Sequence, residues 1–452
     1  MSRTETLDNT TMTNGPITRI LLSFAGPVLL GQLLQQLYNI ADAAIVGQFL
    51  SSKALAAVGA TSPLSDLLLG LLTGVTDGFG IVIATYFGAQ SAKEMRKAMG
   101  SSILFGVFST ILISSLSLLF LSPILNFLNI TNDLHPFAES YIRIILIGLI
   151  AATFYNVFAA ILRSIGDSFT PLIFLIISTI LNIILDYAFI LYLKMGVAGA
   201  AFATVISQAI SALLCFIYMK HKYPQLKLAR EDFIPNKIIS RSLISTGSSM
   251  AFMSAFVQFG TFTLQTSINT FGTNIIVAHT AARKWTSILM MPWAALGSAL
   301  ATFCGQNWGA KKYSRIKKGL RDTILLCWAW CILVVIIVFT ICPFLIQLIT
   351  ATKEPEILHT ASLYLKVNTI FYFIVVVICL SRDAMQGFGN NKTPVFSSSL
   401  ELLTKVVIAF VLAPAIGYWG IIISEPVAWA IMVIPLVVNL LKNPILKQPD
   451  GV

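Results

Sequence analysis

Long apolar runs constrain this chain more than any other feature of its sequence. A helix needs about 20 mostly apolar residues to cross a bilayer, whereas a membrane-barrel strand needs about ten with alternating polarity. The sequence contains twelve runs of the first kind, approximately at 17–48, 54–87, 96–121, 136–162, 168–193, 197–219, 240–268, 276–304, 319–349, 358–381, 394–414 and 418–441. These runs predict an all-α polytopic membrane protein with twelve transmembrane helices, several long enough to tilt or bend.

Composition excludes the main alternatives. Hydrophobic residues make up 56% of the 452 residues and charged residues 11%, whereas a soluble domain carries about 25% charged residues. A soluble enzyme, a disordered chain and a disulfide-stapled secreted domain do not fit these values. The six cysteines lie in apolar runs and the four histidines are scattered, so we expect no disulfide framework and no metal centre or catalytic site built from them. A protein that is not an enzyme and holds no cofactor is therefore predicted.

The basic residues fall mainly on one side of the predicted membrane. With the N-terminus inside, the inner segments hold 22 of the 30 Lys and Arg residues, and the outer loops hold three. Such an excess marks the cytoplasmic side, so both termini are predicted to be cytoplasmic. The net charge of +11 is then a topology signal that needs no nucleic acid partner. The first fifteen residues show no signal-peptide pattern, which favours the cytoplasmic membrane of a bacterium.

Two stretches of sequence recur in the second half of the chain. FGAQSAKEMRKAMGSSI at 87–103 aligns without gaps with WGAKKYSRIKKGLRDTI at 308–324. LRSIGDSFTP at 162–171 aligns with MQGFGNNKTP at 385–394, at nearly the same offset along the chain. The chain therefore contains an internal repeat. Six spans in each copy make the copies parallel, with a symmetry axis along the membrane normal.

The longest internal polar stretch separates the two copies. We predict an N-terminal six-helix lobe at 1–219, a cytoplasmic linker at 220–241 and a C-terminal six-helix lobe at 242–452. Two pseudo-symmetric bundles suit the alternating access of a secondary transporter, although receptors and channels also use helix bundles.

The opening segment of the chain resembles a known family. GPITRILLSFAGPVLLGQLLQQLYNIADAAIVGQFLSSKALAAVG at 15–59 is similar to the start of the multidrug and toxic compound extrusion (MATE) family. The G-A-basic segment of each half, the G-D-x-x-x-P element at 166–171 and NIILDYAFILYLKMGVAGAAFAT at 182–204 are similar too, so the resemblance covers essentially the whole chain. It implies the MATE fold of two six-helix lobes and cation-coupled export of amphipathic, often cationic, compounds. The larger superfamily also contains lipid-linked saccharide flippases.

Acidic residues inside the spans are candidates for function, because a carboxylate at mid-bilayer costs about 3 kcal/mol. Six lie well within spans: Asp42, Asp66, Asp77, Asp186, Glu401 and Glu425. Asp42 ends a polar stripe in which Gln35, Tyr38 and Asn39 precede it at helical spacing. That stripe must face a cavity or a partner helix, so its residues are candidates for a substrate cleft. For Asp66 and Asp77, three turns apart on one face, helix packing is the favoured role.

A second polar pair lies on the fifth span. Asn182 and Asp186 are four residues apart and share a helix face, and Thr204 follows on the sixth span. Together with Asp42 they would form an oxygen cage for Na⁺. Alternatively, the two carboxylates would share a proton, since like charges repel, or the four residues would only join helices through hydrogen bonds. The family resemblance implies that the positions matching these four carry the cation site of the N-terminal lobe.

Pro27 interrupts the first span fifteen residues before Asp42. Proline removes a backbone hydrogen bond and kinks a helix. The resemblance implies that this helix bends when the nearby site is protonated, while the alternative is a static kink.

The C-terminal lobe departs from the family pattern, because no Asp or Glu occurs between Asp232 and Asp322. NorM-type members carry a carboxylate on the seventh span, so a cation site of that type is not expected here. Glu401 is placed to pair with Lys405 four residues later. Glu425 has no obvious local partner and would bind either substrate or a neighbouring helix.

Aromatic residues follow the seventh span at helical spacing, with Phe256 and Phe259 at its centre. They would stack on flat cations if they line a cleft, although ordinary packing is the favoured explanation. We therefore predict a monomeric antiporter that exchanges organic cations or amphipathic drugs for H⁺ or Na⁺. The alternative is a flippase for lipid-linked saccharides or other lipid precursors, which needs a basic cleft. Five basic residues inside spans allow this: Arg143, Arg283, Lys284, Lys366 and Lys405.

Overall fold

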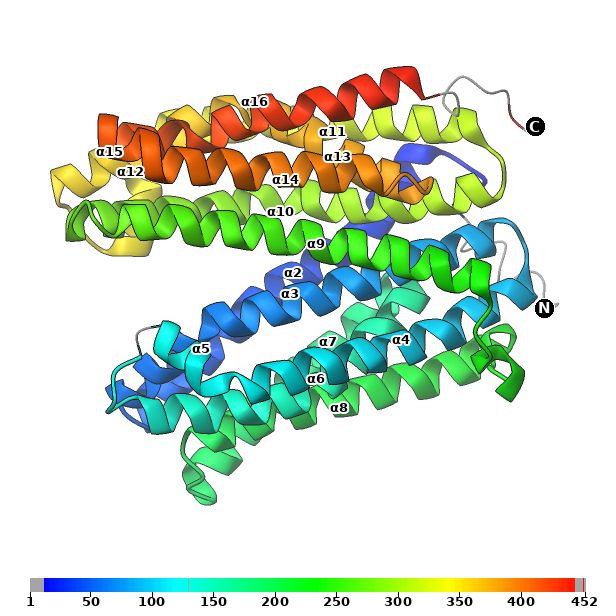
Figure 1. The fold of residues 1–452 in the computed structure, drawn as a ribbon, viewed down its shortest axis with the longest axis horizontal. Coiled ribbons are helices and arrows are strands. Elements are labelled where there is room, and N and C mark those ends of the chain that lie inside the picture. Colours follow the sequence, from blue (N-terminus) through cyan, green and yellow to red (C-terminus); the bar gives the residue numbers. More distant parts are fainter. Residues whose placement is uncertain (1–11, 129, 444–449, 451–452) are drawn as a thin grey trace. The chain divides into compact units, whose positions relative to one another are not determined.

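The structure is a computed structural model that describes residues 12–128, 130–443 and 450. The described residues form helices joined by short turns, and no strand occurs within those ranges (Figure 1). The first half contains α2 (Ile17–Phe49), α3 (Ser52–Gly88), α4 (Ala92–Leu119), α5 (Leu121–Phe127), α6 (His135–Ser164), α7 (Phe169–Tyr187) with the π-helix η1 (Ala188–Tyr192), and α8 (Val197–Lys222). The 3₁₀ turns η2 (Pro224–Leu226) and η3 (Arg230–Phe233) follow.

The second half has the same order of long helices. It contains α9 (Lys237–Ile268), α10 (Thr273–Gly309), α11 (Tyr313–Thr350), α12 (Pro355–Ile370), α13 (Tyr372–Gly387), α14 (Lys392–Val407) with the π-helix η4 (Ile408–Leu412) and α15 (Ala413–Ile416), and α16 (Tyr418–Lys442). Each of the twelve predicted runs therefore coincides with a helix or with two or three joined helices. Among the described residues, ten helices are apolar and long enough to cross a membrane, and the bent pair of α12 and α13 makes up to eleven. The Ser- and Thr-rich α9 is not among them.

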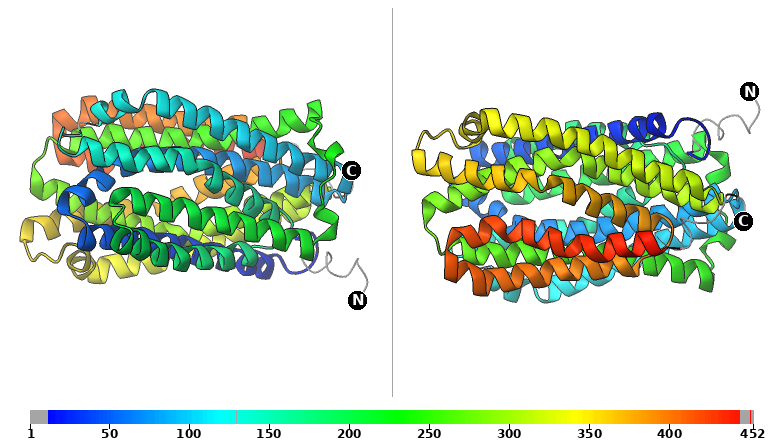
Figure 2. Two further views of the ribbon diagram at one scale, coloured as in Figure 1. Left: turned by 90° about the horizontal axis from the view of Figure 1, so that it is seen from below. Right: turned by 90° about the horizontal axis from the view of Figure 1, so that it is seen from above.

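One predicted run is broken in the structure. The run 358–381 divides at Phe371 into α12 and α13, which meet at a bend of 55° (Figure 2). Polar side chains compete for carbonyls just before the break: the Asn368 amide donates to Tyr364 O and Ile422 O, and the Thr369 hydroxyl donates to Leu365 O. Side chains that bond to helix carbonyls in this way favour bends.

The described helices fall into two compact units. The first unit is Gly26–Ala251, and the second consists of the described residues of Met12–Ala25 and Phe252–Val452. In the first unit, α6 packs against α3, α4 and α8 around the fully buried residues Ile83, Met99, Ile161 and Cys215. The boundary between the units falls inside α2, next to Pro27, and inside α9.

The internal repeat is visible in the backbone of each half. Gln90 and Lys311, which the repeat aligns, both have a φ of 56°. Gly196 and Gly417, which are separated by the same 221 residues, have φ values of 62° and 67°. Left-handed backbone is rare for residues other than glycine. Its recurrence at Gln90 and Lys311 therefore supports the internal repeat. The π-helices η1 and η4 also occupy corresponding places.

The G-D-x-x-x-P element is a helix start. The Asp167 carboxylate accepts from the Thr170 N–H (3.0 Å) and hydroxyl (2.7 Å) at the beginning of α7, and from the Tyr223 hydroxyl (2.7 Å) after α8. In the second half, Asn390 takes the corresponding place before α14, where its side-chain oxygen accepts from the Thr393 N–H (3.4 Å). The element satisfies free N–H groups of a helix end, which gives it a structural role.

The segment that precedes α2 belongs to the second unit. Met12 N–H donates to Gln306 Oε1 (2.7 Å), and Met12 O accepts from Asn307 Nδ2 and Arg315 Nη2 (3.2 Å each). Arg315 also donates to Gly15 O (3.0 Å), and Lys312 donates to Thr13 O (2.9 Å). We call residues 12–15 the N-terminal strap, which the α10–α11 junction holds in place.

Candidate functional site

The predicted cation site is assembled in the first unit. Asp42 comes from α2, Asn182 and Asp186 from α7, and Thr204 from α8. Asn182 and Asp186 are fully buried and Asp42 is 9% exposed. The i, i+4 spacing places Asn182 and Asp186 on the same face of α7. The structure therefore brings together four residues from three helices, the first of which lies far from the other two in the sequence.

Asn182 connects this group. With its amide nitrogen directed at Asp186, it donates to Asp186 Oδ2 (3.2 Å) and accepts from the Thr204 N–H (3.2 Å). That orientation satisfies both ends of the amide. The Thr204 hydroxyl lies 2.9 Å from the Tyr38 hydroxyl, so α2, α7 and α8 are joined around one buried polar centre.

The two carboxylates are not fully satisfied. Asp42 Oδ1 and Asp186 Oδ1 are buried without a hydrogen-bond partner among the described residues. The two carboxyl groups lie close enough to share a hydrogen bond once either one carries a proton. Buried polar atoms normally have partners, so each exception needs an explanation. The arrangement is therefore suited to take up a cation, either a proton between the carboxyl groups or a metal ion.

The oxygen set also fits Na⁺, which is a hard cation. Two carboxylates, an amide and a hydroxyl are the oxygen ligands that hard cations prefer. No group of three or more His, Cys, Asp or Glu side chains that would hold a metal ion occurs in the described part of the chain. The donor set at Asp42 is compatible with H⁺ and with Na⁺.

The rest of the predicted stripe on α2 divides in two. Tyr38 turns toward Thr204 and joins the buried group, whereas Gln35 and Asn39 are exposed. Pro27 lies inside the same helix, next to the boundary at which α2 passes from the second compact unit to the first.

A second polar cluster occupies the second unit. Glu425 on α16 accepts from Arg283 on α10 and from Lys405 on α14, both at 3.1 Å and both on Oε1. The sequence shows no local partner for Glu425 because Arg283 lies 142 residues away and Lys405 lies on a different helix. The predicted pair of Glu401 with Lys405 is confirmed at 2.8 Å, and Arg382 lies 3.9 Å from the same carboxylate. Lys405 is 1% exposed, so this is a buried ion-pair network.

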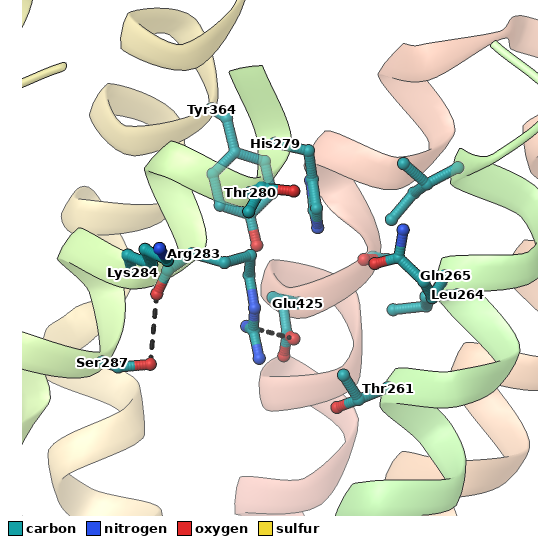
Figure 3. Close-up of a pocket in the computed structure, with 12 residues that line it drawn as sticks. Thr261, Leu264, Gln265, His279, Thr280, Arg283, Lys284, Ser287, Tyr364 and Glu425 are labelled. Carbon is teal, nitrogen blue, oxygen red and sulfur yellow. Dashed lines mark hydrogen bonds and ion pairs between the residues drawn. The ribbon is translucent and has the colours of Figure 1, made fainter. Parts of the chain in front are cut away.

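The network borders a pocket of about 250 Å³ (Figure 3). Its walls come from α9, α10, α12 and α16, and its lining residues are Thr261, Leu264, Gln265, Ile268, His279, Thr280, Arg283, Lys284, Ser287, Tyr364, Ser424 and Glu425. Figure 3 shows the Arg283 guanidinium beside Glu425, with the Tyr364 hydroxyl directed toward Arg283. Sequence reasoning did not connect Tyr364 or His279 with this pocket.

The aromatic residues of α9 do not line this pocket. Phe256 stacks on Phe252 with ring centroids 6.2 Å apart, and Phe259 is 50% exposed. The pocket wall on α9 consists instead of Thr261, Leu264, Gln265 and Ile268.

Two other charges inside predicted spans have structural partners. Asp77 accepts from Arg163 at 2.8 Å, which joins α3 to α6 as the packing role requires. Arg143 pairs with Glu139 one turn earlier on α6 and is more than half exposed. Neither charge borders the pocket of the second unit.

These features define an α-helical membrane protein built from two copies of one helical unit, with a buried acidic centre in the first copy and an ion-pair network in the second. A protein-family model described as MatE matches residues 27–188 and 249–411, and the chain therefore belongs to the MATE family. The fold is the twelve-helix MATE fold, in which α9 is the seventh long helix.

Curated relatives and solved structures agree with this assignment. The chain is 27% identical over 403 residues to "Probable multidrug resistance protein NorM" of Thermotoga maritima, which covers 88% of this chain and 86% of that protein. It is 28% identical over 385 residues to "Probable multidrug resistance protein YpnP" of Bacillus subtilis, covering 83% and 84%. A structure described as a MATE protein "in the bent conformation" superimposes with a TM-score of 0.89 at 21% identity, covering 96% and 97%.

Proposed function

We propose that the protein is a secondary active antiporter that exports amphipathic, often cationic, drugs or toxic compounds in exchange for H⁺ or Na⁺ by alternating access. It works as a monomer in the cytoplasmic membrane of a bacterium, with both termini in the cytoplasm. Membership of the MATE family and the names of the relatives support the substrate class.

The observation that carries the proposal is the carboxyl pair of Asp42 and Asp186. Each has a buried oxygen without a partner among the described residues, at a depth where an unused carboxylate is costly. A site of this kind gains stability when it takes up a positive charge. An ion gradient would supply that charge from outside the cell.

Coupling requires that occupancy of the pair biases the transporter between two conformations. In the vacant state the carboxylates attract a cationic substrate. Uptake of H⁺ or Na⁺ removes this attraction, so the substrate is released outside. Pro27 lies in α2, the helix that carries Asp42, and removes one of its backbone hydrogen bonds. Binding of the ion at Asp42 would therefore bend the helix at Pro27. The exposed Gln35, Asn39 and Phe259 are proposed substrate contacts, together with Phe256.

The test uses purified protein in liposomes loaded with a fluorescent organic cation. A pH gradient and a Na⁺ gradient are imposed separately, on the wild type and on Asp42→Asn. The gradient that drives dye movement in the wild type identifies the ion, and the variant should lose that movement while it remains folded. Unchanged movement in folded Asp42→Asn would remove Asp42 from the mechanism.

One observation favours the alternative, a flippase for lipid-linked saccharides or other lipid precursors. Such a protein needs a basic cleft for a pyrophosphate headgroup, and Arg283 and Lys284 both line the pocket of the second unit. Against it, the acidic centre at Asp42 has no use in binding a polyanion. Flipping of a fluorescent lipid-linked saccharide by reconstituted protein, with no gradient-driven export of organic cations, would establish the alternative.

A further inference from the structure

The pocket of the second unit has more positive than negative charge around it. Arg283 and Lys284 line the pocket together with a single carboxylate, Glu425, which Lys405 also contacts. Two cationic side chains therefore stand beside one carboxylate in the described lining of the pocket. A cavity with such an excess attracts anions.

Glu425 already serves as the counter-charge of two cationic side chains. Its Oε1 already accepts from Arg283 and from Lys405, each at 3.1 Å, and its side chain is 7% exposed. Releasing it to a third cation would leave Arg283 without its carboxylate and Lys405 with Glu401 alone. Removing one partner from a buried ion pair is destabilising, because it leaves an uncompensated charge. The pocket is thus poorly suited to a cation and well suited to an anion.

Hydrogen-bond donors remain free for such an anion. A guanidinium has five N–H donors in a planar fork. Arg283 uses one of them on Glu425 and lies beside the Tyr364 hydroxyl, so the remainder of the fork faces the pocket. Its side chain is 33% exposed and lies across the pocket from Thr261 on α9 (Figure 3). Lys284 is exposed and forms no ion pair among the described residues. A carboxylate or phosphate would match the fork of Arg283, with Lys284 as a second donor.

The volume limits which part of a ligand enters. The pocket of about 250 Å³ is smaller than the about 300–1,000 Å³ of a drug-sized site. It therefore has room for a charged headgroup and a few carbon atoms. Leu264 and Ile268 form the apolar part of the wall, along which the first carbons of a chain would lie.

We propose that this pocket binds the carboxylate or phosphate group of an amphipathic substrate, with Arg283 as the principal donor and Lys284 as the second. This inference rests on the proposed transport function, because it names a chemical class among the exported compounds, namely amphiphiles with a negative charge. It assigns the second unit a role in substrate selection, distinct from the cation site at Asp42.

Two matched probes test the charge preference by direct binding. Full-length protein in phosphatidylcholine nanodiscs is titrated with 11-(dansylamino)undecanoic acid and with its primary amide, and dansyl anisotropy is recorded. The acid should bind at least about ten-fold more tightly than the amide, as expected for charge-assisted hydrogen bonds. Equal affinities of the acid and the amide would overturn the proposal.

Two substitutions that should change the affinity for the acid in opposite directions distinguish a binding role from a folding defect. Arg283→Gln should weaken binding of the acid about ten-fold and leave the amide unchanged, whereas Glu425→Gln should strengthen binding of the acid, since Arg283 is then free of its carboxylate. Arg321→Gln, at a side chain that is 69% exposed, is the matched control and should change neither. A purely structural role for Arg283 and Glu425 predicts weaker binding in both variants, and that result would contradict the proposal.

Competition distinguishes a free amphiphile from a lipid headgroup. Displacement of the acid probe by dodecyl phosphate in phosphatidylcholine discs identifies a free amphiphile as ligand. If the acid probe is instead displaced only when the discs contain phosphatidylglycerol, the ligand is a lipid headgroup. Both outcomes support an anionic group in the pocket, and displacement by neither would refute it.

The Asp42→Asn variant separates this inference from the proposed antiport. It should bind the acid probe with wild-type affinity and lose gradient-driven export. Selective binding of the acid by a wild type that shows no gradient-driven export would refute the antiporter and keep the pocket. Gradient-driven export without selective binding of the acid would refute the pocket and keep the antiporter.

Discussion

The hydroxyl groups of Tyr38 and Thr204 lie 2.9 Å apart and join α2 to α8 beside the carboxyl groups of Asp42 and Asp186. Thr204 is joined to α7 as well, because its N–H donates to the Asn182 side chain. Asp42 and Tyr38 are four residues apart on one helix, so a shift of α2 would be felt at both positions. The hydrogen bond therefore holds the helix that carries Asp42 in register with the other two helices of the site.

Removing that hydrogen bond should loosen the proposed cation site without abolishing it. Tyr38→Phe and Thr204→Val should each lower the thermal stability of the detergent-purified protein by about 1 kcal/mol, the net value of one hydrogen bond. The double variant should cost less than the sum of the two single variants, because both remove the same contact. Fully additive losses in thermal unfolding would show that the two hydroxyls do not interact.

Breaking the buried network in the second unit should cost more. Lys405→Met leaves Glu401 without its close partner and Glu425 with Arg283 alone, so we expect a loss of about 3–5 kcal/mol, as for other buried pairs that lose one member. The exposed pair of Arg143 and Glu139 is the comparison, and Arg143→Gln should cost about 0–1 kcal/mol. Unfolding monitored by size-exclusion chromatography after heating measures both. Equal losses in the two variants would contradict the difference in burial.

Close helix packing predicts a size limit at Gly78. A Cβ added there would lie 2.6 Å from the Gly247 Cα, a backbone atom on α9 that cannot move aside alone. Gly78→Val should therefore sharply reduce the yield of folded protein, since small residues permit such close approach of membrane helices. Gly70→Ala on the same helix meets no atom within 4 Å and should be tolerated. Normal yield and stability of Gly78→Val would show that α3 and α9 do not pack this closely.

The loop between α5 and α6 should respond to acid. The hydrogen bond from the Thr131 hydroxyl and the contact with Lys53 (3.2 Å) lower the pKa of Asp133 below its ordinary value. A carboxyl group whose folded pKa is lowered contributes stability above its unfolded pKa and loses it as the pH falls through the folded pKa. Hydrogen exchange of the peptide around 131–135 should therefore speed up as the pH drops below the usual range for aspartate, after correction for intrinsic rates. In Asp133→Asn this acid-dependent step should be absent, and its persistence would assign the effect to another group.

The fold could be predicted from the sequence because the length of an apolar run is a local signal for a membrane helix. The run lengths identified every long helix, and the two aligned motifs revealed the repeat that also appears in the backbone at Gln90 and Lys311. The break at Phe371 could not be predicted from spacing, because it depends on Asn368 reaching a carbonyl of α16, a tertiary contact.

The two polar centres also differ in how far they could be predicted from local spacing. Asn182 and Asp186 share a helix face, so their i, i+4 spacing was informative in the sequence itself, and the pair of Glu401 and Lys405 was predictable for the same reason. The link between Arg283 and Glu425 crosses 142 residues and leaves no periodic signal. Charge inside an apolar run indicated that both residues needed partners, but only the packed helices identify them.

The N-terminal strap has a consequence for the order in which this chain can fold. Its backbone groups at Met12, Thr13 and Gly15 bind side chains about 300 residues later in the sequence, on α10 and α11 and at the turn between them. During synthesis the first helix would enter the membrane long before Lys312 and Arg315 leave the ribosome, since chains elongate at about 5–20 residues per second. The beginning of α2 can thus reach its final position only late in biogenesis, and the first half made alone would lack the contacts that anchor it.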